Sequence, residues 1–103
     1  MEELLKLKNM KNCDWIRTPK GASGLYHIET LKDENLFVII SNIEHYKQRK
    51  DEMKLYKLIH KFQPEECPKV VSFIKKPKQV CLILEWKDTL FMEKIINYYS
   101  NYM

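Results

Sequence analysis

The chain has 103 residues, of which 45% are hydrophobic and 31% charged, and this composition is typical of one globular domain rather than a disordered protein. The formal net charge is +4, but the lysines are scattered among acidic residues, which favours a mixed, solvated surface over a nucleic-acid-binding footprint. Because the N-terminal segment carries two early glutamates and no apolar run approaches membrane-span length, we expect neither a signal peptide nor a membrane span.

The first part of the chain predicts a short helix followed by a meander of strands. Leucines among charged residues suit a short helix over residues 2–11. Residues 14–31 hold two extended runs around the stretch PKGASG, and the polar residues 32–35 predict a turn. The compact apolar run LFVII, residues 36–40, has the length and β-branched content of a strand.

The middle of the chain predicts one long helix over residues 43–62. Ser41, followed three residues later by Glu44, is a capping-box pattern that predicts a helix start near Asn42. Pro64 predicts that the helix ends before it, because proline disfavours helical backbone in the preceding residue. Helical spacing predicts an inward apolar face formed by Leu55, Leu58, Ile59 and Phe62.

The last part predicts two strands and a final helix. Residues 70–74 and 80–86 are strand-like runs joined by a lysine-rich turn over residues 75–79, and the second run is apolar enough to be central in a sheet. Asp88 or Thr89 is placed to cap the final helix. Its predicted apolar face comprises Leu90, Phe91, Ile95 and Tyr98 or Tyr99.

These elements predict a single α+β domain over residues 1–103, with a five-stranded antiparallel sheet, one long helix across it and short terminal helices. From about residue 13 to 100, this order resembles the small N-terminal lobe of a protein kinase, closest to casein-kinase-I-like kinases. The matching stretches are GASGLY (21–26), LFVII with the following serine (36–41), DEMKLYKLI (51–59), CPKVVSFI (67–74) and LILEWKDTL (82–90).

The resemblance also implies which catalytic parts this sequence lacks. Of the glycine-rich phosphate loop only Gly21 and Gly24 remain, and Ser41 occupies the position of the third-strand lysine. Glu52 matches the helix glutamate that this lysine would pair with. Neither an H-R-D nor a D-F-G motif occurs, so the resemblance implies no phosphoryl transfer, no bound cofactor and no enzymatic activity.

Each of these positions also has a simpler explanation. Gly21 and Gly24 would suit a tight hairpin turn as well as an anion-binding loop. Glu52 is either a relic of the kinase ion pair, a partner contact, or a helix carboxylate paired with Arg49 or Lys57.

The cysteines and histidines predict no site. Cys13, Cys67 and Cys81 are odd in number and form no C-x-x-C pair, which favours buried free thiols in a reducing, cytoplasmic compartment. The three histidines lie far apart without metal-ligand spacing, so we expect neither a metal site nor a Cys–His nucleophile.

The leading functional hypothesis is a non-catalytic kinase-small-lobe mimic that binds and inhibits a protein kinase or another protein partner. Its size and its lysine- and asparagine-rich composition would suit a virus- or parasite-encoded regulator. Without a large lobe, we expect an exposed apolar surface on the hinge side that a partner, or a second copy in a homodimer, would cover. The expected partner-binding residues are Trp86, Phe91, Ile95, Tyr98, Tyr99 and Glu52.

Two alternatives belong to other classes. The net charge and the 12% aromatic content would suit a small basic inhibitor or nucleic-acid-binding protein unrelated to kinases. A split kinase completed by another chain is the enzymatic alternative, and the missing strand lysine argues against it.

Overall fold

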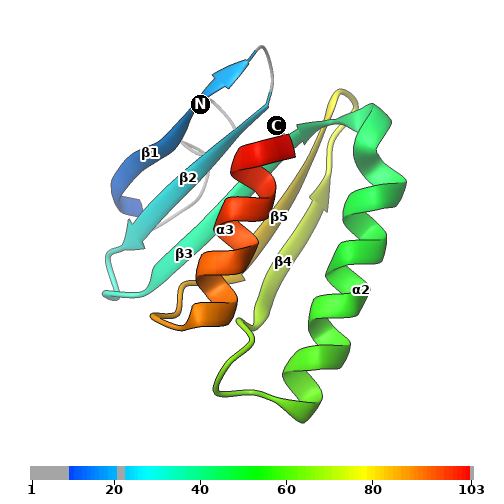
Figure 1. The fold of residues 1–103 in the computed structure, drawn as a ribbon. Coiled ribbons are helices and arrows are strands. Elements are labelled where there is room, and N and C mark those ends of the chain that lie inside the picture. The colour runs from blue at the N-terminus through cyan, green and yellow to red at the C-terminus, as the bar shows by residue number, and fades with distance from the viewer. Residues whose placement is uncertain (1–9, 21–22, 103) are drawn as a thin grey trace.

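The computed structural model describes residues 10–20 and 23–102, with side chains described from residue 24 to residue 101. One antiparallel sheet carries two helices, which lie side by side on the same face of the sheet (Figure 1). The predicted α+β class with an antiparallel sheet is confirmed.

The strands are β1 (Met10–Lys20), β2 (Ser23–Thr30), β3 (Asn35–Asn42), β4 (Val70–Lys75) and β5 (Gln79–Glu85). Their order across the sheet is β1-β2-β3-β5-β4, and each neighbouring pair is antiparallel. Side chains are described for nearly all of β2 and for the whole of β3, β4 and β5, whereas β1 is described by its backbone pairing with β2.

The predicted N-terminal helix falls mostly on residues outside the described part of the chain. Its last two residues, 10 and 11, belong to β1, so the prediction of helix there is wrong. Gly21 also lies outside the described residues. Gly24 lies in β2 opposite Ile40 of β3, and is therefore part of the sheet ladder rather than of a loop.

The two central strands are buried on both faces, which explains their nearly continuous apolar sequences. Phe37 of β3 and Leu82 of β5 point toward the helices. Val38 and Ile83 belong to a second apolar cluster, and alternation along a strand places them on the opposite face of the sheet. The prediction that residues 80–86 form a central strand is confirmed, because β5 lies between β3 and β4.

The long helix begins later than predicted and ends where predicted. β3 continues to Asn42, a 3₁₀ turn covers Ile43–His45, and α2 covers Tyr46–Phe62. Neither helical segment has a side-chain cap hydrogen bond at its N-terminus, so the predicted capping box is wrong. The Ser41 hydroxyl is buried and accepts a hydrogen bond from Arg49 instead.

The predicted apolar face of α2 is also wrong. Tyr56 and Arg49 are buried against the rest of the domain, and Met53 and Ile59 are half-buried beside them. The physical reason is that Arg49 and Tyr56 find hydrogen-bond partners inside the domain, so burying them leaves no polar group unpaired. The three remaining apolar residues of the predicted face, Leu55, Leu58 and Phe62, are exposed.

The final helix, α3 (Leu90–Tyr102), runs antiparallel to α2 (Figure 1). Thr89 caps it, because its Oγ1 accepts a hydrogen bond of 3.1 Å from the backbone N–H of Met92. Met92, Ile95 and Tyr99 form its buried face, whereas Leu90 is exposed, contrary to the prediction. Within the described part of the chain, no helix has both the length and the apolar character needed to cross a membrane.

Candidate functional site between the two helices

A carboxylate on α2 gathers hydrogen-bond donors from both helices. Glu52 accepts hydrogen bonds from Arg49 Nη1 at 3.1 and 3.2 Å, and from the Tyr99 hydroxyl at 2.7 Å. The Tyr98 hydroxyl donates at 3.1 Å and Gln48 Nε2 at 3.4 Å. We call this group the Glu52 cluster; together with the residues that contact these donors, it comprises Ser41, Gln48, Arg49, Glu52, Tyr56, Tyr98 and Tyr99.

The ion pair in this cluster is largely removed from water. The Arg49 side chain is 5% exposed and the Glu52 side chain 14%, and the two residues lie one helical turn apart on α2. Arg49 Nε donates to Ser41 Oγ at 2.9 Å, and its guanidinium lies 5.1 Å from the centre of the Tyr99 ring. The alternative in which Arg49 pairs with Glu52 is therefore confirmed.

Two tyrosines complete the cluster from opposite helices. The Tyr56 and Tyr99 hydroxyls lie 3.0 Å apart, and since Tyr99 donates its proton to Glu52, Tyr56 donates to Tyr99. Burial, with the negative charge of Glu52 adding to it, raises the pKa of Tyr56 to about 12. Burial also raises the pKa of Tyr99 well above its usual value, and the neighbouring Tyr56 adds to this. Both phenols therefore remain neutral donors at physiological pH.

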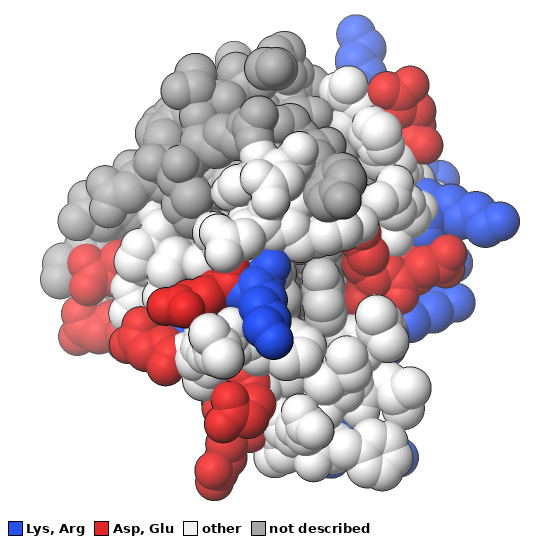
Figure 2. All heavy atoms as spheres, in the orientation of Figure 1, with Lys and Arg blue, Asp and Glu red and all other residues white. Residues whose placement is uncertain are grey.

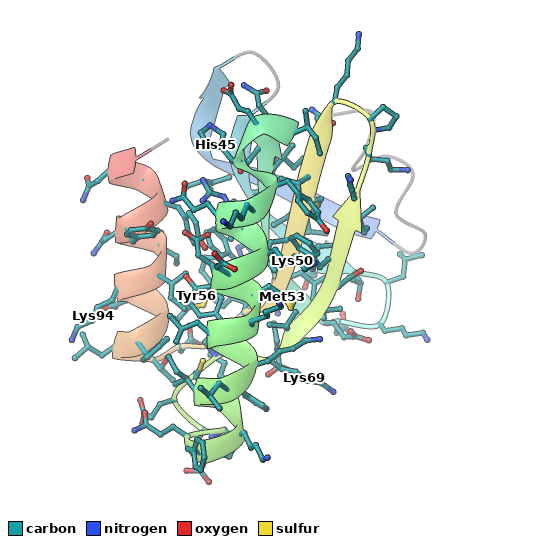
Figure 3. The ribbon with its side chains drawn as sticks, turned by 90° about the vertical axis from the view of Figure 1, so that its right-hand side faces the viewer. His45, Lys50, Met53, Tyr56, Lys69 and Lys94 are labelled. Atoms are coloured by element: carbon teal, nitrogen blue, oxygen red, sulfur yellow. The ribbon has the colours of Figure 1, made fainter. Side chains whose placement is uncertain are left out.

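The cluster links the two helices through hydrogen bonds. The bonds from Tyr98 and Tyr99 to Glu52 join residues 46 and 47 positions apart in the chain. Among the described residues, every buried side-chain nitrogen and oxygen has a hydrogen-bond partner. Figure 3 views this arrangement from the side, with α3 and α2 facing each other over the sheet. Glu52 thus accepts hydrogen bonds from four side chains inside the domain.

A shallow cavity of about 520 Å³ lies beside the cluster, on the N-terminal half of α2. Its lining mixes acidic and basic side chains, so it does not favour a ligand of one charge. The lining residues are Glu44, His45, Lys47, Gln48, Asp51, Glu52, Leu55 and Tyr98.

The expected exposed hinge-side surface is only partly present. Ile95 and Tyr99 are buried in the core, so their prediction as exposed partner-binding residues is wrong. Phe91 is half-buried, and Tyr98 is 38% exposed. Trp86 is half-buried and stacks on His27 at 4.1 Å between ring centres. The physical reason is that α3 folds back onto the sheet, where its Phe91, Ile95 and Tyr99 pack in the same apolar cluster as Trp86.

The described cysteines are buried, and one of them lies beside a histidine. Cys67 and Cys81 are buried free thiols, as predicted, while the side chain of Cys13 lies outside the described residues. Burial raises the pKa of Cys67, which disfavours the nucleophilic thiolate. His60 contacts the backbone oxygen of Cys67, not its sulfur. In the described part of the chain, no three His, Cys, Asp or Glu residues converge to hold a metal ion.

Sequence reasoning named Glu52 and its possible partner Arg49 but missed Tyr56 and the burial of all three residues, although a signal for this exists. Arg49, Glu52 and Tyr56 follow one another at spacings of three and four, which places them on one face of a helix. Counting apolar residues alone ranked the leucine-rich face higher and left these three on the solvent side.

Comparisons of the chain with protein-family models, with curated proteins and with solved structures each gave no match. The functional interpretation therefore depends on the chain's own residues and their geometry.

Proposed function

We propose that this chain is a non-catalytic interaction module with the architecture of a kinase small lobe, and that it binds a protein kinase and inhibits it. Three features support the likeness: the antiparallel sheet, the insertion of α2 between β3 and β4, and the helix that follows β5.

The observation that carries the non-catalytic part of the proposal is the position of the buried cation. In protein kinases a lysine on the third strand pairs with the helix glutamate and contacts the nucleotide phosphates. Here Ser41 occupies that strand position, and Arg49 on the helix contacts both Ser41 and Glu52. In the proposed likeness, the cation of this ion pair lies on the helix rather than on the strand, and Glu52, Ser41 and the Tyr99 ring use its bonding capacity.

The position of α3 also supports the proposal that the chain is non-catalytic. A nucleotide gripped by the strand cation would lie on the face of the sheet that carries the helix glutamate. On this face, Tyr99 of α3 packs against Phe37 and donates a hydrogen bond to Glu52. A split kinase completed by a second chain would have to displace α3, with loss of the hydrogen bonds that Tyr98 and Tyr99 donate to Glu52, so we favour the inhibitor over the split enzyme.

A panel of purified protein kinases, assayed on peptide substrates with increasing amounts of this chain, tests the proposal. We expect dose-dependent inhibition of one kinase or a small group, and direct binding to the same kinases by calorimetry. Phe37→Asp, which places a charge in the fully buried core, provides an unfolded control that should lose both effects. If no kinase in the panel is either bound or inhibited, the proposal is wrong.

A further inference from the structure

We infer that the outward face of α2 is the contact surface for the partner, and that it binds an acidic amphipathic helix. This inference rests on the proposed function and identifies the surface and the kind of segment involved. It begins from three apolar side chains on that face, Leu55, Leu58 and Phe62, which we call the α2 stripe. They are 52%, 55% and 74% exposed.

The α2 stripe is a continuous ridge. Its members are three and four residues apart, so they lie on one side of the helix over a length of about 10 Å. In Figure 2, uncharged side chains cover the lower half of α2, where the stripe lies. Single exposed apolar residues are ordinary, but a ridge of large ones on one helix is typical of a protein contact surface.

A row of lysines follows one flank of the stripe. Lys47, Lys54, Lys57 and Lys61 are all exposed, and their helical positions place them on the same side of the ridge. None of the four forms an ion pair with a carboxylate among the described residues. Blue lysine and arginine side chains extend from the right-hand margin of the molecule beside α2 in Figure 2, with red acidic side chains between them.

The combination of ridge and row specifies the partner's chemistry. A helix with leucine-like residues at a spacing of three and four would place its apolar face on the ridge. Acidic residues along one flank of that helix would then meet the lysine row, which speeds association and fixes the orientation. Asp51 is exposed and stands at the N-terminal end of the ridge, so a basic helix would be repelled there.

The position of the lysines on one side of the ridge disfavours two other occupants of this surface, a second copy of the chain and a membrane. In an antiparallel pairing of two copies of α2, the two-fold axis would place one lysine row beside the other, between chains that each carry a net charge of +4. A helix that lies in an anionic membrane surface presents a broad apolar face within a cationic polar face. Here the ridge holds three apolar residues, and lysines of α2 follow only one of its flanks.

A pair of synthetic peptides tests the inference by fluorescence anisotropy. One peptide is a fluorescein-labelled helix with leucines on one face and glutamates beside them, and the other has lysine in place of every glutamate. We expect the acidic peptide to bind with micromolar affinity and the basic peptide not to bind. The double variant Leu58→Ser with Phe62→Ser should weaken binding of the acidic peptide at least about tenfold, and so should the double variant Lys54→Glu with Lys57→Glu. Lys69→Glu with Lys94→Glu changes the net charge equally at exposed sites outside α2 and should leave binding unchanged (Figure 3).

Several results would overturn the inference. These are equal binding of the two peptides, equal weakening by the control pair Lys69→Glu with Lys94→Glu, and no binding of the acidic peptide. Stripe-dependent dimerisation seen by light scattering would assign the surface to a second copy. Stripe-dependent binding to phosphatidylserine-containing vesicles, without peptide binding, would assign it to a membrane.

The kinase panel separates this inference from the proposed function. If the wild-type chain inhibits a kinase and the stripe variants inhibit it equally, the surface is wrong and the function stands. If the acidic peptide binds through the stripe and no kinase is affected, the surface stands and kinase inhibition is wrong.

Discussion

Removal of one buried hydroxyl, by Tyr99→Phe, should destabilise the domain far more than the loss of a single oxygen atom suggests. The Tyr99 side chain is fully buried, and its hydroxyl donates to Glu52 at 2.7 Å while lying 3.0 Å from the Tyr56 hydroxyl. A hydrogen bond to a charged group contributes about 1.5–3 kcal/mol, and a buried hydroxyl left without its acceptor costs about 1–3 kcal/mol. We therefore expect the free energy of unfolding to fall by about 2–4 kcal/mol.

The assay is urea unfolding followed by circular dichroism. For a domain of this size, the expected change moves the urea midpoint by about 1 M or more. Tyr98→Phe is the matched control, because the Tyr98 hydroxyl also donates to Glu52, at 3.1 Å, from a side chain that is 38% exposed. That variant should lose less than about 1 kcal/mol. If the two variants lose equal stability, or if Tyr99→Phe loses less than about 0.5 kcal/mol, the buried cluster described above is wrong.

Three further predictions concern the same core. Arg49→Met should cost about 3–5 kcal/mol in urea unfolding, because it leaves a largely buried carboxylate without its cation, and a loss below about 1 kcal/mol would contradict the ion pair. The pKa of Tyr56 is 10.0 in an unfolded chain and about 12 when folded, so the folded state retains the proton longer. Stability should therefore fall as pH rises from about 10 toward 12. This decline should be shallower in Tyr56→Phe, and an unchanged slope in urea midpoints would count against the raised pKa. Leu58→Ala should change the free energy of unfolding by less than about 0.5 kcal/mol, because Leu58 is exposed, whereas Leu82→Ala should cost about 2–5 kcal/mol, because Leu82 is buried. The reverse order would indicate that the leucine-rich face of α2 packs inward.

Local patterns in the sequence were sufficient for the elements of the central sheet. The continuous apolar run of β5 predicted a central strand because both of its faces are buried, one against the helices and one in the second apolar cluster. Pro64 correctly predicted the end of α2 at Phe62, since its effect on the preceding backbone acts within a few residues.

The orientation of α2 could not be predicted from its own residues. The partners that make Arg49 and Glu52 burial favourable come from β3 and from α3, up to 47 positions away in the chain. The spacing of apolar residues predicts that the leucines face inward. It cannot predict that an ion pair is buried when the other residues that bond to the pair are unknown. The same limitation applies to Ser41, which matches a capping-box pattern while its hydroxyl bonds to Arg49.

The candidate site was predicted in part. Glu52 was identified through the kinase resemblance, and Arg49 was named as one of its possible partners, which the structure confirms. The expected exposure of Ile95 and Tyr99 was wrong, because it assumed that the face which meets the large lobe in a kinase stays uncovered in this chain. In the structure the sheet's apolar face is covered by α3 itself, and the exposed ridge is on α2.

The central claim of the proposal is that the Glu52 cluster closes the nucleotide face of a kinase-like lobe. The most direct test is a titration of the ¹⁵N-labelled chain with a magnesium complex of a non-hydrolysable ATP analogue. The amide signals of Gly24, Ser41 and Glu52 lie on the elements that would meet a nucleotide. We predict that these signals do not move at millimolar nucleotide, because the buried cation Arg49 is already bonded to Ser41 and Glu52, and Tyr99 packs against Phe37 on the same face. Saturable shifts of these signals, together with shifts along α3 as it is displaced, would contradict the claim and support a split kinase.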